Sequence, residues 1–185
     1  MTDDELYSLY TGRGDASAAD ALIAKYTGRM IMYVYAMIHD LRDAEDLVIE
    51  TFAVILTKRP TIRPGGFQAY LYQSVRHRAL RFSARRRRLN VFSMEDKEAE
   101  ELQAVRPEDE FLRDERRQAV RRCLNRISPE CREALWLIFF EGLSYAEAAA
   151  VMGVNSKKVD NLLTKGKKSM KSELIREGIT GANEA

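Results

Sequence analysis

The sequence is poor in several residue types, and each shortage excludes a class of protein. Its 185 residues include two cysteines, two histidines, four prolines and one tryptophan. Cys123 and Cys131 have no CxxC spacing and no histidine beside them, so we expect two buried thiols rather than a zinc site or a disulfide framework. No apolar run approaches the roughly 20 residues that cross a bilayer. We therefore expect a soluble globular protein without membrane insertion.

Signatures of catalysis are also missing. The sequence has no nucleophile elbow, no phosphate-binding loop and no dinucleotide fingerprint, and its histidines lack metal-ligand spacing. The Glu-x-x-His pattern of di-metal helical bundles is absent as well. We predict that the protein is not an enzyme and holds no metal ion and no cofactor. Its acidic start, MTDDELYSLY, lacks the features of a secretory signal, so we expect a cytoplasmic protein.

Charge is segregated along the chain although the net charge is only +2. The net is +4 over residues 1–88, −7 over 89–115 and +5 over 116–185. The acidic segment lacks a sustained apolar period, which is typical of a solvated linker. With 45% apolar residues the chain can build two small cores. We predict two domains, at 1–88 and 109–178, joined by a flexible linker at 89–108 and followed by a tail at 179–185.

Helical periods dominate both predicted domains. Apolar residues recur every three to four positions over 17–39, from Ala44 to the break at Arg59-Pro60, and from Phe67 toward Arg88. We expect these three helices to share one core. In the second domain a helix ends near Ile127, and Ser128-Pro129 starts another. The apolar run EALWLIFF (residues 133–140) predicts a helix at the buried centre of that domain. The predicted fold class is all-α.

Residues 141–174 carry the pattern of a helix-turn-helix motif. Ser144 and Glu147 form a capping box, Gly153 ends the first helix, and Val159 and Leu163 mark the apolar side of the second. The outer face of the second helix is basic and polar, and such a helix can read base edges in the major groove. A plain helical hairpin with a basic face is the alternative. The residues on this face are Lys157, Asn161, Thr164 and Lys168, with Lys158 and Lys165 beside them.

Two further clusters lie in the first domain. Arg78, Arg81, Arg85 and Arg88 are spaced to share one helical face, where they could follow a phosphate backbone. Aromatic residues at the start of the same helix could stack on unpaired bases, but aromatics at helical spacing more often belong to a core. We favour the core for Phe67 and leave Tyr70 open. Residues 40–50 contain five acids against one arginine, a face suited to a basic protein surface.

Three segments together resemble a known family. The stretches DAEDLVIETF (43–52), FQAYLYQSVRHRAL (67–80) and EGLSYAEAAAVMGV (141–154) are similar to regions 2 and 4 of bacterial RNA polymerase sigma factors of the extracytoplasmic-function (ECF) class. The resemblance runs from about residue 18 to 176. It implies a three-helix region 2-like domain and a region 4-like helix-turn-helix domain. It also implies a sigma factor that directs promoter recognition and transcription initiation, with core RNA polymerase, promoter DNA and an anti-sigma factor as partners.

The resemblance also assigns roles by position. The first domain would bind the clamp helices of the largest polymerase subunit and the melted minus-10 element, and the second would read the minus-35 element. The implied polymerase-binding residues are Asp43, Glu45, Asp46, Leu47 and Glu50. The implied minus-10 residues follow the loop at 61–66 and are Phe67, Tyr70, Arg76, His77, Arg78, Arg81 and Arg85. The implied minus-35 residues are Ser156, Lys157, Lys158, Asn161, Thr164, Lys165 and Lys168.

Some positions depart from the family pattern, and two other functions stay open. Ile49 stands where Gln is usual, Tyr70 where Trp is common and His77 where Asn is usual. Asp160 and Leu162 occupy positions that are often basic, and Gly166 replaces a common Ala at a cost of up to about 1 kcal/mol of helix stability. A stand-alone helix-turn-helix regulator would bind duplex DNA without polymerase. A decoy that sequesters an anti-sigma factor would bind that partner and no DNA.

Overall fold

The computed structural model describes residues 1–92 and 115–178. Every regular element among these residues is helical, which confirms the predicted all-α class. The chain divides into two compact units, Met1–Ala104 and Val105–Ala185, called here the N-terminal unit and the C-terminal unit. Most of the predicted linker and all of the predicted tail lie outside the described residues. No helix in the described part of the chain is long and apolar enough to span a bilayer.

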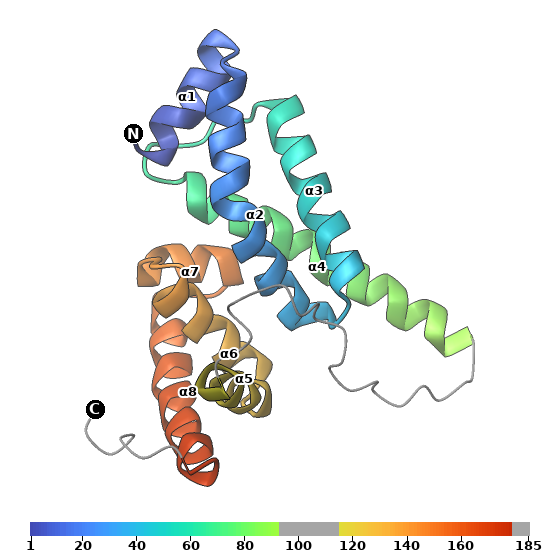
Figure 1. Ribbon diagram of the computed structural model, residues 1–185, viewed down its shortest axis with the longest axis vertical. Helices are drawn as coiled ribbons and strands as arrows, with labels where there is room; N and C mark the ends of the chain where they lie inside the picture. The colour runs from blue at the N-terminus through green and yellow to red at the C-terminus, as the bar shows by residue number, and fades with distance from the viewer. Residues whose placement is uncertain (93–114, 179–185) are drawn as a thin grey trace. The chain divides into compact units, whose positions relative to one another are not determined.

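Residues 1–92 of the N-terminal unit form four helices (Figure 1). Three of them, α2 (Ala16–Ile38), α3 (Leu41–Lys58) and α4 (Phe67–Phe92), match the periods found in the sequence. The fourth, α1 (Asp3–Arg13), was not predicted. It begins at a capping box, because the Thr2 hydroxyl accepts a hydrogen bond from the Glu5 amide at 3.3 Å and the Glu5 carboxylate accepts one from the Thr2 amide at 2.7 Å. The expected three-helix bundle is therefore a four-helix unit.

The helices of the N-terminal unit share one core, as expected. Leu22, Met30, Val48 and Leu71 are fully buried and come from three different helices. Aromatic rings close the end of this core where α1 covers α2 and the start of α4 (Figure 1). There the Phe67 ring centroid lies 5.1 Å from that of Tyr7 and 6.1 Å from that of Tyr26. Such tilted ring pairs stabilise beyond the area they bury, so α1 is an integral part of this unit.

The C-terminal unit is built from α5 (Glu115–Arg126), α6 (Pro129–Leu135), α7 (Tyr145–Met152) and α8 (Ser156–Arg176). Proline occupies the first turn of α6, as predicted. Cys123 and Cys131 are both buried free thiols, which confirms that expectation. Burial raises the pKa of the Cys123 thiol, so it stays protonated and packs as an apolar group.

The apolar run at residues 133–140 does not form one buried helix, and that prediction was wrong. After α6 the chain makes a π-helical turn, η2 (Trp136–Phe140). A π turn holds more residues than an α turn, so the side chains within it are rotated from the positions that a continued α-helix would give them. Phe139 and Phe140 are consequently 57% and 52% exposed. The Lys167 ammonium lies 5.1 Å from the centroid of the Phe139 ring and covers part of it.

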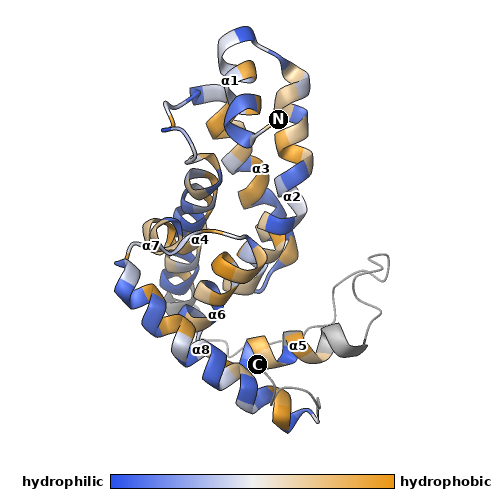
Figure 2. Cartoon of the chain, turned by 90° about the vertical axis from the view of Figure 1, so that its left-hand side faces the viewer, coloured by the Kyte–Doolittle hydropathy of each residue, from blue (hydrophilic) through white to orange (hydrophobic). Residues whose placement is uncertain are grey.

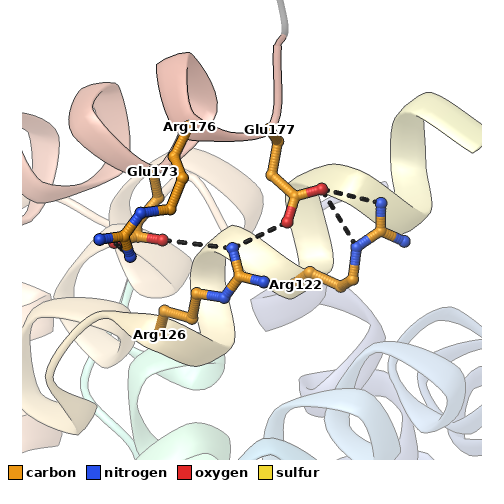
Figure 3. A network of polar contacts seen from close by, with 5 residues as sticks. All are labelled: Arg122, Arg126, Glu173, Arg176 and Glu177. Carbon is orange, nitrogen blue, oxygen red and sulfur yellow. Dashed lines mark hydrogen bonds and ion pairs between the residues drawn. The ribbon is translucent and has the colours of Figure 1, made fainter.

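Ion pairs fix the far end of α8 to α5 (Figure 3). Arg126 donates to the Glu177 carboxylate at 2.7 Å and to that of Glu173 at 3.4 Å. Arg122 donates to the other oxygen of Glu177 at 3.0 Å. Together with Arg176, which pairs with Glu173, these residues form a network rather than isolated surface pairs. The orientation of α8 is thus set at its C-terminal end as well as at the turn that precedes it.

Candidate nucleic-acid and protein interfaces

The helix-turn-helix forms as its sequence predicts. The Ser144 hydroxyl accepts from the Glu147 amide at 3.2 Å, and the Glu147 carboxylate accepts from the Ser144 amide at 2.8 Å. α7 then ends at Gly153, whose φ of 69° lies in the left-handed region that favours glycine. Two residues later Asn155 caps α8, with its side chain accepting from the Lys158 amide at 2.8 Å. The turn is therefore fixed by caps on both sides.

α8 is amphipathic, with hydrophobic and hydrophilic residues alternating along it (Figure 2). Val159, Leu162 and Leu163 are buried against the rest of the C-terminal unit. All seven residues that the sequence assigned to minus-35 DNA are exposed to solvent. These exposed residues are Ser156, Lys157, Lys158, Asn161, Thr164, Lys165 and Lys168. They offer lysine donors and one amide at spacings suited to a duplex groove.

Two departures from the family pattern have structural reasons. Leu162 is only 4% exposed, so an apolar residue there completes the core beneath α8. Gly166 permits close packing, because a Cβ built on it would lie 3.0 Å from Leu135 Cδ1 and 3.3 Å from Cys131 Cβ. Glycine thus lets α8 approach α6 where a larger residue would force the helices apart. One predicted DNA residue also has an internal partner, since Lys158 lies 3.6 Å from the Glu130 carboxylate.

The acidic cluster of the sequence lies at the start of α3. Asp40 caps the helix and accepts a hydrogen bond from the Asp43 amide at 3.0 Å. Burial, followed by the nearby Asp40 carboxylate, raises the pKa of Asp43, although Arg86 at 3.9 Å opposes that shift. Glu45 and Asp46 are exposed on the first turns. This end of α3 therefore presents negative charge to solvent.

The exposure of one apolar residue on α3, Ile49, was not predicted from the sequence. Ile49 is 63% exposed and lies among the acids of the same face, next to Glu50. The signal was available, because Ile49 falls outside the apolar stripe that Leu47, Val48 and Phe52 bury. An apolar side chain that lies beside several carboxylates suits a partner surface that is basic and partly apolar.

Three of the four arginines in the basic stripe of α4 line a cavity of about 540 Å³ that α4 shares with α3. α3 contributes Glu50 and Lys58 to its lining. Lys58 had not been assigned a role, although its charge and its position in the last turn of α3 place it beside the stripe. The residues of α4 that line the cavity include Tyr70, His77, Arg78, Arg81 and Arg85. Five of the seven residues assigned to minus-10 DNA are thereby brought into one place; Arg76, from the same set, does not line the cavity.

An ion pair connects the two residue sets of the N-terminal unit. Arg78 Nη1 lies 3.1 Å from Glu50 Oε2, with the Glu50 side chain 63% exposed and that of Arg78 30% exposed. The sequence had given Glu50 to polymerase binding and Arg78 to minus-10 DNA. The energy of such a partly exposed pair is small, about 0–1 kcal/mol. Polymerase bound to Glu50, or DNA bound to Arg78, could therefore replace this ion pair.

Two assigned residues are corrected by their burial. Phe67 is 2% exposed and packs against Tyr7 and Tyr26, so its ring belongs to the core and does not offer a stacking surface for a base. This agrees with the preference for a core role. Leu47 is 8% exposed and lines the cavity beside Glu50, so it offers a partner little surface and supports the face by packing. Tyr70, which the sequence left open, is half-buried at the cavity.

Family models match both units. Residues 22–89 match the model described as Sigma-70 region 2, and residues 117–170 match the model described as Sigma-70, region 4. α1 lies before the first matched segment. The acidic face of α3 and the basic stripe of α4 fall inside region 2, while α7 and most of α8 fall inside region 4.

Three curated proteins are similar over most of this chain. It is 27% identical to ECF RNA polymerase sigma factor SigE of Mycolicibacterium smegmatis, over 96% of this chain and 71% of that protein. The identity is 34% to ECF RNA polymerase sigma factor BldN of Streptomyces coelicolor, over 80% of this chain and 57% of BldN. It is 30% to RNA polymerase sigma-H factor of Pseudomonas aeruginosa, over 76% of this chain and 77% of that factor.

Solved structures share the fold. RpoE of Bartonella quintana, solved in complex with the anti-sigma factor NepR, gives a TM-score of 0.64 at 21% identity and covers 84% of this chain and 95% of its own. CnrH, solved with the cytosolic domain of CnrY, also gives 0.64, at 19% identity, and covers 95% of this chain and 99% of its own. At these identities the likeness concerns the arrangement of helices.

Proposed function

Because this chain belongs to the sigma-70 family, as an ECF RNA polymerase sigma factor, we propose that its two units divide the recognition of one promoter. The protein is a non-enzymatic factor that directs promoter-specific transcription initiation by RNA polymerase. In our assignment residues 1–88 form the region 2-like domain, 89–108 the linker, 109–178 the region 4-like domain and 179–185 the tail. The factor acts in the cytoplasm, where polymerase and chromosome meet.

Polymerase docks on the acidic face of α3. Glu45, Asp46 and Glu50 are the exposed acids of that face and can pair with arginines on the clamp helices of the largest subunit. Asp43 contributes from the first turn, and Leu47 supports the face from beneath. Ile49 adds an apolar contact at its centre. An interface of this kind combines charge steering with a small desolvated core.

The minus-10 element binds along α4 and the loop that precedes it. Arg81 and Arg85 are exposed, and they supply phosphate contacts from the α4 wall of the cavity shared with α3. Tyr70, half-buried at the other end of that cavity, is the aromatic candidate for stacking on an unpaired base. His77 and Arg78 line the space between them. Trapping unpaired bases here makes strand opening favourable through binding energy alone, without covalent chemistry.

The minus-35 element is read by α8. The observation that carries the proposal is that one helix following a capped turn exposes all seven assigned residues and buries Val159, Leu162 and Leu163. Lys157 and Asn161, near the N-terminal end of α8, are placed to contact bases, and the lysines farther along contact phosphates. The ion pair of Lys158 with Glu130 is exposed enough to exchange for a phosphate.

Run-off transcription tests the assignment of the polymerase face. Glu50→Lys reverses a charge on α3, and Asp20→Lys makes the same change at an exposed position of α2 away from that face. We expect Glu50→Lys to abolish binding to core polymerase and promoter-specific transcripts while leaving binding to minus-35 duplex DNA intact. Asp20→Lys should retain all three. A stand-alone regulator is the correct description instead if the wild-type protein binds duplex DNA yet never binds core enzyme.

An anti-sigma factor is a further proposed partner. RpoE and CnrH share this fold and were solved with NepR and with the cytosolic domain of CnrY, respectively. We infer that a protein of this kind holds the present factor inactive. Affinity purification from the native cell, followed by run-off transcription with each co-purified protein added back, tests this. A small partner that suppresses transcription supports the proposal, and purification that yields polymerase alone contradicts it.

A further inference from the structure

α1 is the helix of the N-terminal unit that lies wholly outside the family match. The region 2 match begins at residue 22, whereas α1 ends at Arg13. The helix nevertheless touches a segment well inside that match, the loop of residues 59–66 between α3 and α4, called here the 59–66 loop. The residues assigned above to the minus-10 element follow this loop directly on α4, and the proposed function includes the loop itself in that surface. The contacts show what α1 contributes.

Three side chains of α1 hold the backbone at the two ends of the 59–66 loop. The Tyr7 hydroxyl donates to the Pro60 carbonyl at 2.9 Å. The Asp4 carboxylate accepts from the Gly65 amide at 2.6 Å. The Tyr10 hydroxyl donates to the Leu56 carbonyl at 3.0 Å, in the last turn of α3 before the loop begins. Burial raises the pKa of Tyr7, so its hydroxyl keeps the proton that it donates.

Arg59 adds a fourth contact from the loop side. It ends α3 with a φ of 45°, in the left-handed region that a residue with a side chain rarely adopts. Its guanidinium lies 4.8 Å from the centroid of the Tyr10 ring and donates to the Thr11 carbonyl at 3.5 Å. A cation over an aromatic face is an attractive arrangement. α1 therefore helps hold an unusual backbone conformation at the point where the chain leaves α3.

The 59–66 loop has little to fix it from within. Pro60 and Pro64 have no amide hydrogen to donate. One turn, closed by the Gly66 amide donating to the Arg63 carbonyl at 3.0 Å, lies near its end. Between its anchored ends Ile62 and Pro64 line a cavity of about 670 Å³ on the α1 side. The position of the loop's middle therefore depends on the anchors that α1 provides at each end.

α1 is itself rigidly attached, as an anchor must be. The Asp3 carboxylate pairs with the Lys25 ammonium at 2.6 Å and accepts a hydrogen bond from the Tyr26 hydroxyl on α2. Tyr7 packs on the ring of Phe67, the first residue of α4. One helix thus connects α2, the 59–66 loop and the start of α4.

We propose that α1 is a positioning element for promoter opening: Asp4, Tyr7 and Tyr10 hold the 59–66 loop in the conformation that selects the unpaired minus-10 base. The inference rests on the proposed function, because it needs the loop to contact that element. We expect none of the three residues to touch DNA, because each acts through the backbone at or next to the loop. Their loss should therefore change base discrimination more than it changes binding to polymerase or to the minus-35 element.

The test uses holoenzyme, formed from core polymerase and the full chain, and a fluorescent single strand from a promoter that the holoenzyme enriches. The measured quantity is the ratio of affinities for this strand and for one with a single minus-10 base replaced. Asp4→Asn, Tyr7→Phe and Tyr10→Phe each remove one anchor and keep the side-chain shape. We expect each to lower the ratio about three- to tenfold, as the loss of one hydrogen bond implies, with core binding and minus-35 duplex binding unchanged.

Thr2→Ala is the matched control. It removes the cap that starts α1, and so weakens the helix, but it breaks no contact with the 59–66 loop. The inference is overturned if Thr2→Ala lowers the discrimination ratio as much as the anchor variants do, since the effect would then be general destabilisation. It is equally overturned if all three anchor variants keep the wild-type ratio.

A separate variant distinguishes failure of this inference from failure of the proposed function. Arg81→Ala removes an exposed phosphate contact on α4 that does not involve α1. If Arg81→Ala weakens binding of the single strand while the anchor variants do not change the ratio, only the role of α1 is refuted. If neither Arg81→Ala nor the anchor variants change binding, the assignment of this surface to the minus-10 element is refuted as well.

Discussion

Replacing Gly166 by alanine sets two opposing effects against each other. Gly166 lies inside α8 and is buried against α6. Alanine would favour the helix by about 1 kcal/mol, because glycine loses more backbone freedom on folding. The new Cβ, however, would lie 3.0 Å from Leu135 Cδ1 and 3.3 Å from Cys131 Cβ, closer than ordinary van der Waals contact. The Leu135 side chain can rotate, but Cys131 Cβ moves only with α6.

The structure indicates that the steric effect is larger. Overpacking of this kind typically costs about 1–3 kcal/mol, so the two effects together predict that Gly166→Ala destabilises the C-terminal unit by about 1 kcal/mol. The relief of the clash can also be tested. Leu135→Val shortens the nearer neighbour, and the double variant should be less destabilised than the sum of the two single variants by at least about 0.5 kcal/mol.

Urea denaturation followed by tryptophan fluorescence measures this directly. The chain has one tryptophan, Trp136, which lies next to Leu135, so its emission reports the C-terminal unit. Gly28→Ala is the matched control: Gly28 lies inside α2 with no atom near its built Cβ. Urea unfolding of the Gly28→Ala variant is followed by circular dichroism, and we expect the N-terminal unit to be stabilised by about 0.5–1 kcal/mol. A Gly166→Ala variant that is more stable than wild type would refute the packing argument.

Three other predictions follow from the C-terminal unit. Lys157→Ala should weaken binding to minus-35 duplex DNA and reduce the slope of its salt dependence by about one ion. Asn161→Ala should lower the free energy of discrimination at one base pair by about 1–3 kcal/mol. Binding titrations at several salt concentrations distinguish the two effects. Ser144→Ala, which removes the cap of α7, should lower the unfolding free energy by about 1 kcal/mol in the tryptophan assay. The hydrogen bonds from Arg122 hold the pKa of Glu177 below its ordinary value of 4.5. The Glu177 carboxylate therefore stabilises the fold at pH values above 4.5, and this stabilisation is lost as the pH falls through the lowered pKa of the folded protein. The stability difference between wild type and Glu177→Gln should then be constant at neutral pH and shrink in acid; a difference that grows in acid would contradict this.

Periodicity was sufficient to predict most helices and the helix-turn-helix. Apolar spacing located α2, α3 and α4, and capping residues located α7 and α8, because these signals are local and each is repeated several times. α1 was missed since its apolar residues, Leu6, Tyr7, Leu9 and Tyr10, span little more than one helical turn. Tyr7 and Tyr10 also use their hydroxyl groups to bind the distant backbone at Pro60 and Leu56. The exposure of Phe139 was missed because a π turn leaves no mark in a hydropathy pattern.

The sequence by itself determined the all-helical class, the family, and the residue types available for DNA and polymerase, because composition, helical period and motif spacing are written in chain order. The tertiary structure decided which of those residues reach solvent. It buried Phe67 and Leu47, exposed Ile49, paired Glu50 with Arg78, and set α1 against a loop about fifty residues away in sequence. Those outcomes depend on contacts between distant segments, which packing creates and local sequence does not specify.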